Sequence, residues 1–366
     1  MNNEQIIFIG DFSSPFSASI LSKIDSVRDI TKSHLVIGNL ESSMLSQNKC
    51  RKLVHIHSTS YLKEFIAKQG IKIVSLANNH VMDYGSEGLC QLIDLLNKNK
   101  VYHCGAGGNL SEAMEPIEVQ IENRKWAFMS YAWPLIEAIP ARKNRAGIAP
   151  LNKKSIIKII HKLKSKNDEI CIMLHWGYEY EKYPLPAHRK LAHTLIDAGA
   201  TIIIGHHPHR IQGIEYYKNK MIAYSLGNFF FPLENYSNLQ KGYYGHANKY
   251  KGLLIQYNPN KPTHPTLFEA NYNSADHSLK INPITNNFLS ELKQLSKPLQ
   301  LNDEQYLNFF KKNRARHKLL PIMTGGKLDI LKSIWLKIRS QGIYVIIKLH
   351  NIIKHRYINK NKVESQ

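Results

Sequence analysis

The chain has 366 residues, of which 43% are hydrophobic and 10% are aromatic. This apolar content excludes a largely disordered protein. The length exceeds what one hydrophobic core usually supports, which favours one large domain with an appendage, or two domains. The formal net charge is +21, and the segment from Lys311 onward holds 14 Lys and Arg against two acidic residues. Such a basic segment is typical of contact with anionic membranes or nucleic acid.

The cysteines and the first residues predict a reducing, intracellular environment. The four cysteines have no CxxC spacing, which favours free thiols over a disulfide framework or a zinc ribbon. The first residues lead directly into the apolar run IIFIG, without the basic region and cleavable stretch of a secretory signal. No run of about 18 uncharged apolar residues occurs, so a spanning helix is not expected. We therefore expect a cytoplasmic protein.

Apolar periodicity predicts alternating strands and helices along the first 230 residues or so. The predicted strands cover residues 6–10, 34–38, 71–77, 101–107, 125–133, 169–177, 201–207 and 220–231. The predicted helices cover residues 20–30, 61–68, 88–97, 155–164 and 188–198. This alternation is typical of an α/β domain whose sheets are covered by helices.

The later part of the chain has a different pattern. Residues 252–257 and neighbouring segments resemble antiparallel strands, so we expect the β additions near 210–285 to form a second sheet. Residues 286–320 are predicted to be helical and polar. Residues 327–356 then carry an apolar face interleaved with Lys and Arg. We therefore predict a main domain over residues 1–285 and a basic helical C-terminal extension over residues 286–366.

Five polar loops, each following an apolar strand, contain side chains that bind metal ions. The candidates are Asp11 in GDFSS; Asn39 and Glu41 in GNLES; Asn79, His80 and Asp83 in ANNHVMDYG; His175 and Glu179 in HWGYEY; and His206, His207 and His209 in GHHPH. Ligands of α/β sheets bind beyond the carboxyl ends of the strands, so we expect these loops to converge. Carboxylate, carboxamide and imidazole donors suit hard or borderline divalent ions such as Mn, Fe, Zn or Mg, whereas a soft metal site would use thiolates. Their combination is what a two-metal hydrolytic centre needs, with one carboxylate as the bridge.

The motifs GDFSS, GNLES, LANNHVMDYG, HWGYEY, GHHPHRIQ and YSLGNFFF have a recognisable order and spacing. Over roughly residues 5–235 the chain resembles the CapA poly-gamma-glutamate capsule-synthesis family, a branch of the calcineurin-like metallophosphatase superfamily. The resemblance implies an α/β fold of four layers, α-β-β-α. It also implies a centre of one or two divalent ions (Mn, Fe, Zn or Mg) at the strand-end loops, and a phosphoester or anionic polymer as substrate.

The resemblance also implies roles for individual residues. The residues that correspond to metal ligands are Asp11, Glu41, Asn79, His175 and two of His206, His207 and His209. His80 corresponds to the histidine that assists the leaving group. For Asp83 two interpretations stay open, because it either orients His80 by a hydrogen bond or caps the helix that follows.

Two positions depart from the general metallophosphatase pattern. The usual D-x-H opening reads Asp11-Phe12-Ser13, so one histidine ligand is missing. An asparagine, Asn39, replaces the usual bridging aspartate, which leaves Glu41 as the expected bridge. We expect Asn39, Glu179 and Asn228 to contact the substrate.

These observations favour a metal-dependent phosphoesterase that acts in the biosynthesis of capsule or another anionic polymer of the poly-gamma-glutamate type. The alternative is a non-catalytic metal- or polyanion-binding component of a membrane-associated assembly for polymer synthesis. Nucleic acid is not expected as a partner, because no recognised binding motif accompanies the charge.

The basic helix expected over residues 327–339 also allows two interpretations. It either lies on an anionic membrane at the inner face, as a peripheral contact, or docks on the main domain with a solvated basic face.

Overall fold

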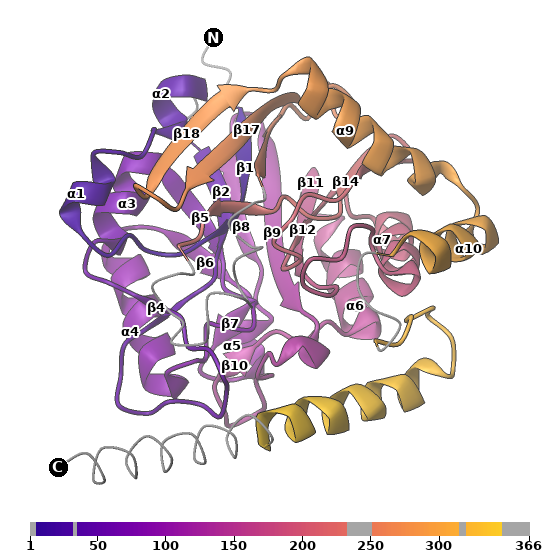
Figure 1. The fold of residues 1–366 in the computed structure, drawn as a ribbon, viewed down its shortest axis with the longest axis horizontal. Coiled ribbons are helices and arrows are strands. Elements are labelled where there is room, and N and C mark those ends of the chain that lie inside the picture. Colours follow the sequence, from indigo (N-terminus) through magenta and orange to yellow (C-terminus); the bar gives the residue numbers. More distant parts are fainter. Residues whose placement is uncertain (1–4, 32–34, 233–250, 315–319, 346–366) are drawn as a thin grey trace, which may run out of the picture.

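The computed structural model describes residues 5–31, 35–232, 251–314 and 320–345, and two packed sheets form its centre (Figure 1). Within the described residues, the first sheet has the order β18 (Ser278–Pro283), β17 (Thr266–Asn273), β16 (Gly252–Tyr257), β1 (Ile6–Phe12), β2 (Leu35–Leu40), β5 (Ile71–Ser75) and β6 (Tyr102–Cys104), with β15 (Asn228–Phe230) also paired to β1. The second sheet has the order β13 (Ile214–Tyr217), β14 (Lys220–Ala223), β12 (Ile202–His206), β11 (Glu169–His175), β9 (Arg124–Ala132) and β8 (Ile117–Ile121). Each sheet contains a parallel central part, which is β1-β2-β5-β6 in the first and β9-β11-β12-β14 in the second.

Helices cover the outer faces of both sheets, and the inner faces pack on each other. The main helices are α3 (Leu62–Gln69) and α4 (Gly85–Lys98) beside the first sheet, and α6 (Lys153–Leu163) and α7 (Pro186–Ala198) beside the second. Phe8 and Ile37 from the first sheet and Phe128 from the second belong to one buried cluster between the sheets. The predicted four-layer α-β-β-α fold is therefore confirmed.

Local sequence patterns explain the covering helices. In α4, Leu89, Leu92 and Leu96 are buried and recur at helical spacing on one face. Burying a leucine side chain stabilises the fold by about 1.5–3 kcal/mol, so this stripe holds the helix on the sheet. Further short elements are β3 (Ser43–Met44), β4 (His57–Ser58), β7 (Ala106–Gly107), β10 (Gly147–Ile148), α5 (Leu110–Ala113) and η1 (Pro134–Ile136).

The helix predicted over residues 20–30 is wrong as a continuous element. The structure has two short helices, α1 (Ala18–Leu21) and α2 (Val27–Thr31). Between them Ile24 forms an isolated bridge with Leu279. Asp25 accepts a hydrogen bond from the backbone N–H of Ile281 at 3.0 Å. Pairing with strand β18, which is remote in sequence, therefore replaces the middle of the predicted helix.

The strands near 210–285 do not form the second sheet by themselves. Only β13 and β14 join that sheet, whose other members come from residues 117–206. Strands β16, β17 and β18 instead extend the first sheet in antiparallel pairing, beginning where β16 pairs with β1. Two packed sheets are present as predicted, but apolar periodicity could not tell which sheet each strand joins.

The segment after residue 285 is helical, as predicted, but it is interrupted. It contains α9 (Asn286–Ser296), the 3-10 helix η4 (Lys297–Gln300) and α10 (Asp303–Asn313). Pro298 lies in the break, and Asn302 begins α10 with a capping box. Residues 329–345 form one further helix, and its predicted continuation to residue 356 lies outside the described residues.

All four cysteines are free thiols, as predicted. In the part of the chain that the structure describes, every helix is too short or too polar to cross a bilayer.

A buried arginine joins α7 to the C-terminal segment. Arg189 donates to Asp303 Oδ1 at 2.8 Å and to the backbone carbonyls of Leu299 and Leu301 at 2.9 and 2.8 Å. The same guanidinium lies 3.5 Å from Glu215 Oε1, and Arg189 and Glu215 are both buried. This side chain therefore connects α7 with η4 and α10.

We predict that Arg189→Ala lowers the free energy of unfolding by about 3 kcal/mol, because it removes the donor from a buried ion pair. Denaturant unfolding of the purified variant measures this change. The neighbouring Lys190 is the control, because it is exposed and lies 3.5 Å from the same Asp303. Lys190→Ala should cost less than about 1 kcal/mol. Equal losses in the two variants would contradict the connecting role of Arg189.

Candidate metal centre

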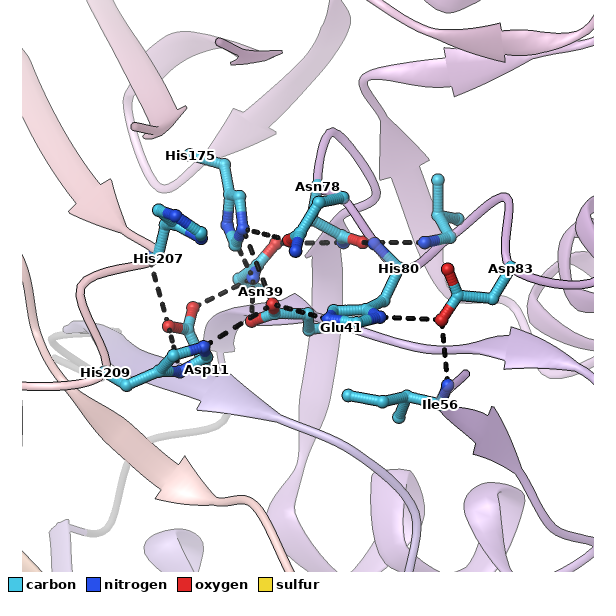
Figure 2. A network of polar contacts seen from close by, with 12 residues as sticks. Asp11, Asn39, Glu41, Ile56, Asn78, His80, Asp83, His175, His207 and His209 are labelled. Carbon is cyan, nitrogen blue, oxygen red and sulfur yellow. Dashed lines mark hydrogen bonds and ion pairs between the residues drawn. The ribbon is translucent and has the colours of Figure 1, made fainter. Parts of the chain in front are cut away.

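The carboxyl ends of parallel strands from both sheets meet at one place, and the polar residues at these ends lie together there (Figure 2). Asp11 on β1 is in register with Asn39 on β2 and with Asn228 on β15. In the second sheet, His175 on β11 is in register with His206 on β12. The registers align these residues within each sheet, and Asn39 Nδ2, which lies 3.2 Å from His175 Nδ1, joins the two sets.

Glycines allow the strands to approach closely just before the donor residues. A Cβ atom on Gly10 would lie 2.0 Å from the carbonyl oxygen of Gly227. A Cβ atom on Gly205 would lie 1.9 Å from the carbonyl oxygen of Tyr224. Only glycine fits at these positions, so the small residue before Asp11 and before His206 has a steric reason.

The GHHPH loop has an unusual backbone. His207 has φ 95° and His209 has φ 54°, which is the left-handed region that residues other than glycine rarely adopt. Such conformations cost of order 1–3 kcal/mol and persist where the surroundings hold them. Here the backbone N–H of His207 donates to Asp11 Oδ2 at 3.1 Å. His209 Nδ1 lies 2.9 Å from Asn228 Oδ1, and a donated hydrogen bond there leaves His209 Nε2 as the ligating nitrogen.

Glu41 is at the centre of the cluster. Its Oε1 atom lies 3.5 Å from His175 Nε2, 3.9 Å from His209 Nε2 and 4.0 Å from His80 Nε2. The carboxylate is fully buried, and Oε1 has no hydrogen-bond partner among the described residues. Burial and the negative charge of Asp11 raise the pKa of Glu41 well above its ordinary value. Lys52 favours the anionic form of Glu41, but its effect is smaller than those of burial and Asp11.

The pKa of the second buried carboxylate, Asp11, is shifted downward, opposite to that of Glu41. Burial alone would raise the pKa of Asp11, but contact with His206 and the nearby His175 and His209 hold it well below its ordinary range. Its Oδ1 atom accepts a hydrogen bond from Asn39 Nδ2 at 2.8 Å and lies 3.1 Å from His206 Nδ1. Asp11 is thus ionised and surrounded by nitrogen donors.

The donor atoms form two overlapping groups, each compact enough to hold one cation. One group is Asp11, Glu41 and His175, and the other is Glu41, His207 and His209. Within each group the donor atoms all lie within 4.8 Å of one another, and every member is buried. Glu41 Oε1 and His207 Nδ1 lack hydrogen-bond partners in the described chain. Carboxylate and imidazole donors of this kind fit a divalent metal ion.

The remaining predicted residues take different places around these groups. Asn79 Oδ1 lies 2.8 Å from His175 Nε2, at the border of the first group. His206 contacts Asp11 and belongs to neither group, whereas His207 and His209 belong to one together. Asn39 is fully buried between Asp11 and His175. Glu179 is half-buried and outside both groups, although its charge contributes to the raised pKa of Glu41.

His80 and Asp83 are paired beside the cluster. His80 Nδ1 lies 2.6 Å from Asp83 Oδ2, which also accepts the backbone N–H of Ile56 at 2.8 Å. The N-cap of α4 is Tyr84, without a side-chain cap hydrogen bond. The geometry thus agrees with the orienting interpretation of Asp83, and His80 Nε2 is left facing Glu41.

Two neighbouring residues were missed in the sequence. Lys52 is buried, donates to Asp83 Oδ1 at 2.9 Å and also contacts the carbonyl oxygen of Asn79. Burial opposes its charge, but Asp83 raises the pKa of Lys52, so the ammonium stays protonated. Asn78 accepts the backbone N–H groups of His80 and Val81. An asparagine after a strand was a visible signal for Asn78, whereas Lys52 in a lysine-rich chain carried none.

Comparison with known proteins agrees with this architecture. Residues 12–233 match the family described as Bacterial capsule synthesis protein PGA_cap, which is more than half of the chain. The chain belongs to this family. The candidate donors lie within the match, except Asp11, which directly precedes it. The resemblance to CapA proteins is therefore confirmed.

Among curated relatives, the chain is 33% identical over 203 residues to the PGA biosynthesis protein CapA of Bacillus subtilis, covering 54% of this chain and 53% of that protein. It is 31% identical over 211 residues to the capsule biosynthesis protein CapA of Bacillus anthracis, covering 55% and 51%. The chain thus spans about half the length of these relatives. Among solved structures, a 5'-nucleotidase from Candida albicans aligns with 84% of this chain and 57% of its own, at 11% identity and a TM-score of 0.43, and this similarity says nothing about activity.

We predict that Lys52→Met lowers the free energy of unfolding by about 3 kcal/mol, because it leaves the buried Asp83 carboxylate with one charged partner fewer. In a protein that already carries Asp83→Asn, Lys52→Met should lower the free energy of unfolding by less. The difference between the two losses is the coupling energy of Lys52 and Asp83. Lys49→Met is the control on the same loop, because Lys49 is exposed. Chemical unfolding of the wild type and the four variants measures these values. A cost for Lys52→Met that does not depend on Asp83 would contradict the pairing.

Proposed function

We propose that the protein is a metal-dependent phosphoesterase that acts in the biosynthesis of capsule or another anionic polymer of the poly-gamma-glutamate type. The observation that carries the proposal is Glu41, a buried carboxylate shared by two compact groups of metal donors. Membership of a capsule-synthesis family supports the biological setting. A phosphoester or an anionic polymer is the proposed substrate class.

The proposed ligands follow from the two groups. Asp11, His175 and Asn79 would hold one ion together with Glu41, and His207 and His209 would hold a second ion, also together with Glu41. When bound, Mn, Fe, Zn or Mg ions supply Lewis acidity that neutralises phosphate oxygens and activates water. Asn228 would keep His209 in the tautomer whose Nε2 faces Glu41.

The proposed catalytic pair is His80 with Asp83. Asp83 accepts the Nδ1 proton of His80, so Nε2 is the atom that would exchange a proton with the leaving oxygen. Burial lowers the pKa of His80 despite the carboxylate beside it. In the neutral imidazole Nε2 carries no proton, so it would first take one up from the attacking water before giving it to the leaving oxygen. Lys52 and the backbone N–H of Ile56 fix the position of Asp83 and thereby the direction of the imidazole.

We predict that the protein loaded with Mn hydrolyses an aryl phosphate or an aryl phosphodiester, and that chelation abolishes this activity. His175→Ala should lower kcat/KM by at least about 100-fold, because loss of a residue that merely orients a metal ligand already costs up to about that factor. His264→Ala is the control, because His264 is exposed and outside the cluster. Activity that survives both chelation and His175→Ala would refute the mechanism.

One observation favours a second function, a non-catalytic component that binds metal or a polyanion. Ser13 stands where a ligating histidine was expected, and its buried hydroxyl has no hydrogen-bond partner among the described residues. The chain therefore lacks one donor of the usual metallophosphatase set.

Elemental analysis combined with binding of poly-gamma-glutamate separates the two functions. Under the second function the protein contains tightly bound metal and binds poly-gamma-glutamate, but it does not turn over any member of a broad phosphoester panel. Hydrolysis that depends on His175 and on metal contradicts it.

For the setting of this activity, we propose a main unit over residues 1–285 and a helical extension over residues 286–366. We also propose a peripheral contact of the extension with the inner face of a membrane.

A further inference from the structure

The helix at residues 329–345 is held on the protein by one side. Leu336 is buried on that side, and Ser340 Oγ donates to Glu137 Oε1 at 2.6 Å. Lys332 Nζ donates to the carbonyl oxygen of Ile322 at 2.7 Å, and the guanidinium of Arg51 lies 4.6 Å from the centre of the Tyr344 ring. These contacts place the helix along one edge of the molecule, where it is drawn in yellow in Figure 1.

The opposite side of this helix is apolar and exposed. Of the eleven exposed large hydrophobic residues in the described chain, seven lie between positions 328 and 345. We call these seven residues the outer strip: Leu328, Ile330, Leu331, Ile334, Trp335, Ile338 and Val345, which are 43–68% exposed. Soluble proteins rarely expose a contiguous apolar surface of this kind without a binding partner. The helix therefore docks through the side that carries Leu336 and Ser340. The sequence suggested that a docked helix would expose a basic face, whereas the exposed face is apolar.

Basic residues flank the outer strip. At about 100° per residue, Lys337 lies along one side of the strip and Arg339 along the other. The guanidinium of Arg339 also lies 5.9 Å from the centre of the Trp335 ring. The sequence beyond residue 345 adds five Lys and Arg against Glu364. This combination of an apolar strip, a tryptophan and flanking cations is typical of helices that lie in the interface of anionic bilayers.

The positive charge of the chain favours an anionic bilayer over a second copy of the chain as the partner of the outer strip. A second copy of the chain would bring another strip with the same basic flanks, and the net charge of +21 would oppose that association. An anionic bilayer instead offers apolar contact for the strip and phosphate groups for Lys337 and Arg339. The family match ends at residue 233, so the strip belongs to a part of the chain outside it.

We propose that the outer strip binds the surface of a bilayer containing anionic phospholipid, with the helix axis in the plane of the interface and its other side still docked on the protein. This inference does not depend on catalysis at the metal centre. Arg51, which contacts Tyr344, directly precedes Lys52, which pairs with Asp83. Membrane binding would therefore hold the loop beside His80 and Asp83 close to the bilayer.

Flotation of the full chain with vesicles tests the proposal. Binding to phosphatidylcholine vesicles with about 30% phosphatidylglycerol should exceed binding to pure phosphatidylcholine by at least about 10-fold, and should fall as salt increases. Ile334→Ser combined with Ile338→Ser should lower this binding by at least about 10-fold, because it removes two apolar side chains from the contact. Leu45→Ser combined with Tyr102→Ser is the matched control, because both residues are exposed apolar residues elsewhere. Metal content and phosphatase activity should be the same in both double variants. A loss of vesicle binding alone would therefore be distinguishable from a failure of the proposed catalytic function.

Trp335 provides a direct readout. It is 44% exposed, whereas Trp126, Trp133 and Trp176 are buried. Anionic vesicles should shift tryptophan emission to shorter wavelength, brominated lipids should quench it, and Trp335→Phe should abolish both effects. Flotation that is unchanged by Ile334→Ser with Ile338→Ser would overturn the proposal. It would also be overturned if the chain ignored vesicles and formed a dimer that this double variant dissociates.

Discussion

The burial of two carboxylates within a shell of imidazoles is the constraint on which the candidate centre depends. Glu41 and Asp11 are fully buried, and charges taken out of water cost several kcal/mol each unless they are compensated. The histidines from the second sheet supply polar partners, and the proposed cations would supply the missing positive charge. The strained backbone at His207 and His209 shows how strongly the surrounding structure holds these donors in place.

The same constraint explains why the two sheets must pack together. Asp11 and Glu41 come from the first sheet, whereas His175 and the GHHPH histidines come from the second. Neither sheet alone contains a complete set of donors. The apolar core between the sheets and the closely packed strand ends at Gly10 and Gly205 therefore position chemistry as well as stabilise the fold.

The loop that contains Arg51 and Lys52 lies between the candidate metal centre and the C-terminal helix. Lys52 fixes Asp83 and, through it, His80, while Arg51 contacts Tyr344 on the C-terminal helix. A surface that binds an anionic bilayer and a centre that acts on an anionic polymer would thus be held by neighbouring residues. The family match covers nearly all of the candidate donors and ends before the extension.

The sequence by itself determined the features that depend on near neighbours. Apolar periodicity predicted α4 and the parallel strands, and the strand-end motifs predicted polar residues near the carboxyl ends of strands, where β1 includes Asp11 and β11 and β12 end at His175 and His206. Contacts between distant residues were decided only by the tertiary structure. These are the pairing of β16 with β1, the contact of Lys52 with Asp83, the separation of His206 from His207 and His209, and the face by which residues 329–345 dock. The physical reason is that periodicity reports which side of an element is apolar, while the partner of that side is set by chain segments far away in sequence.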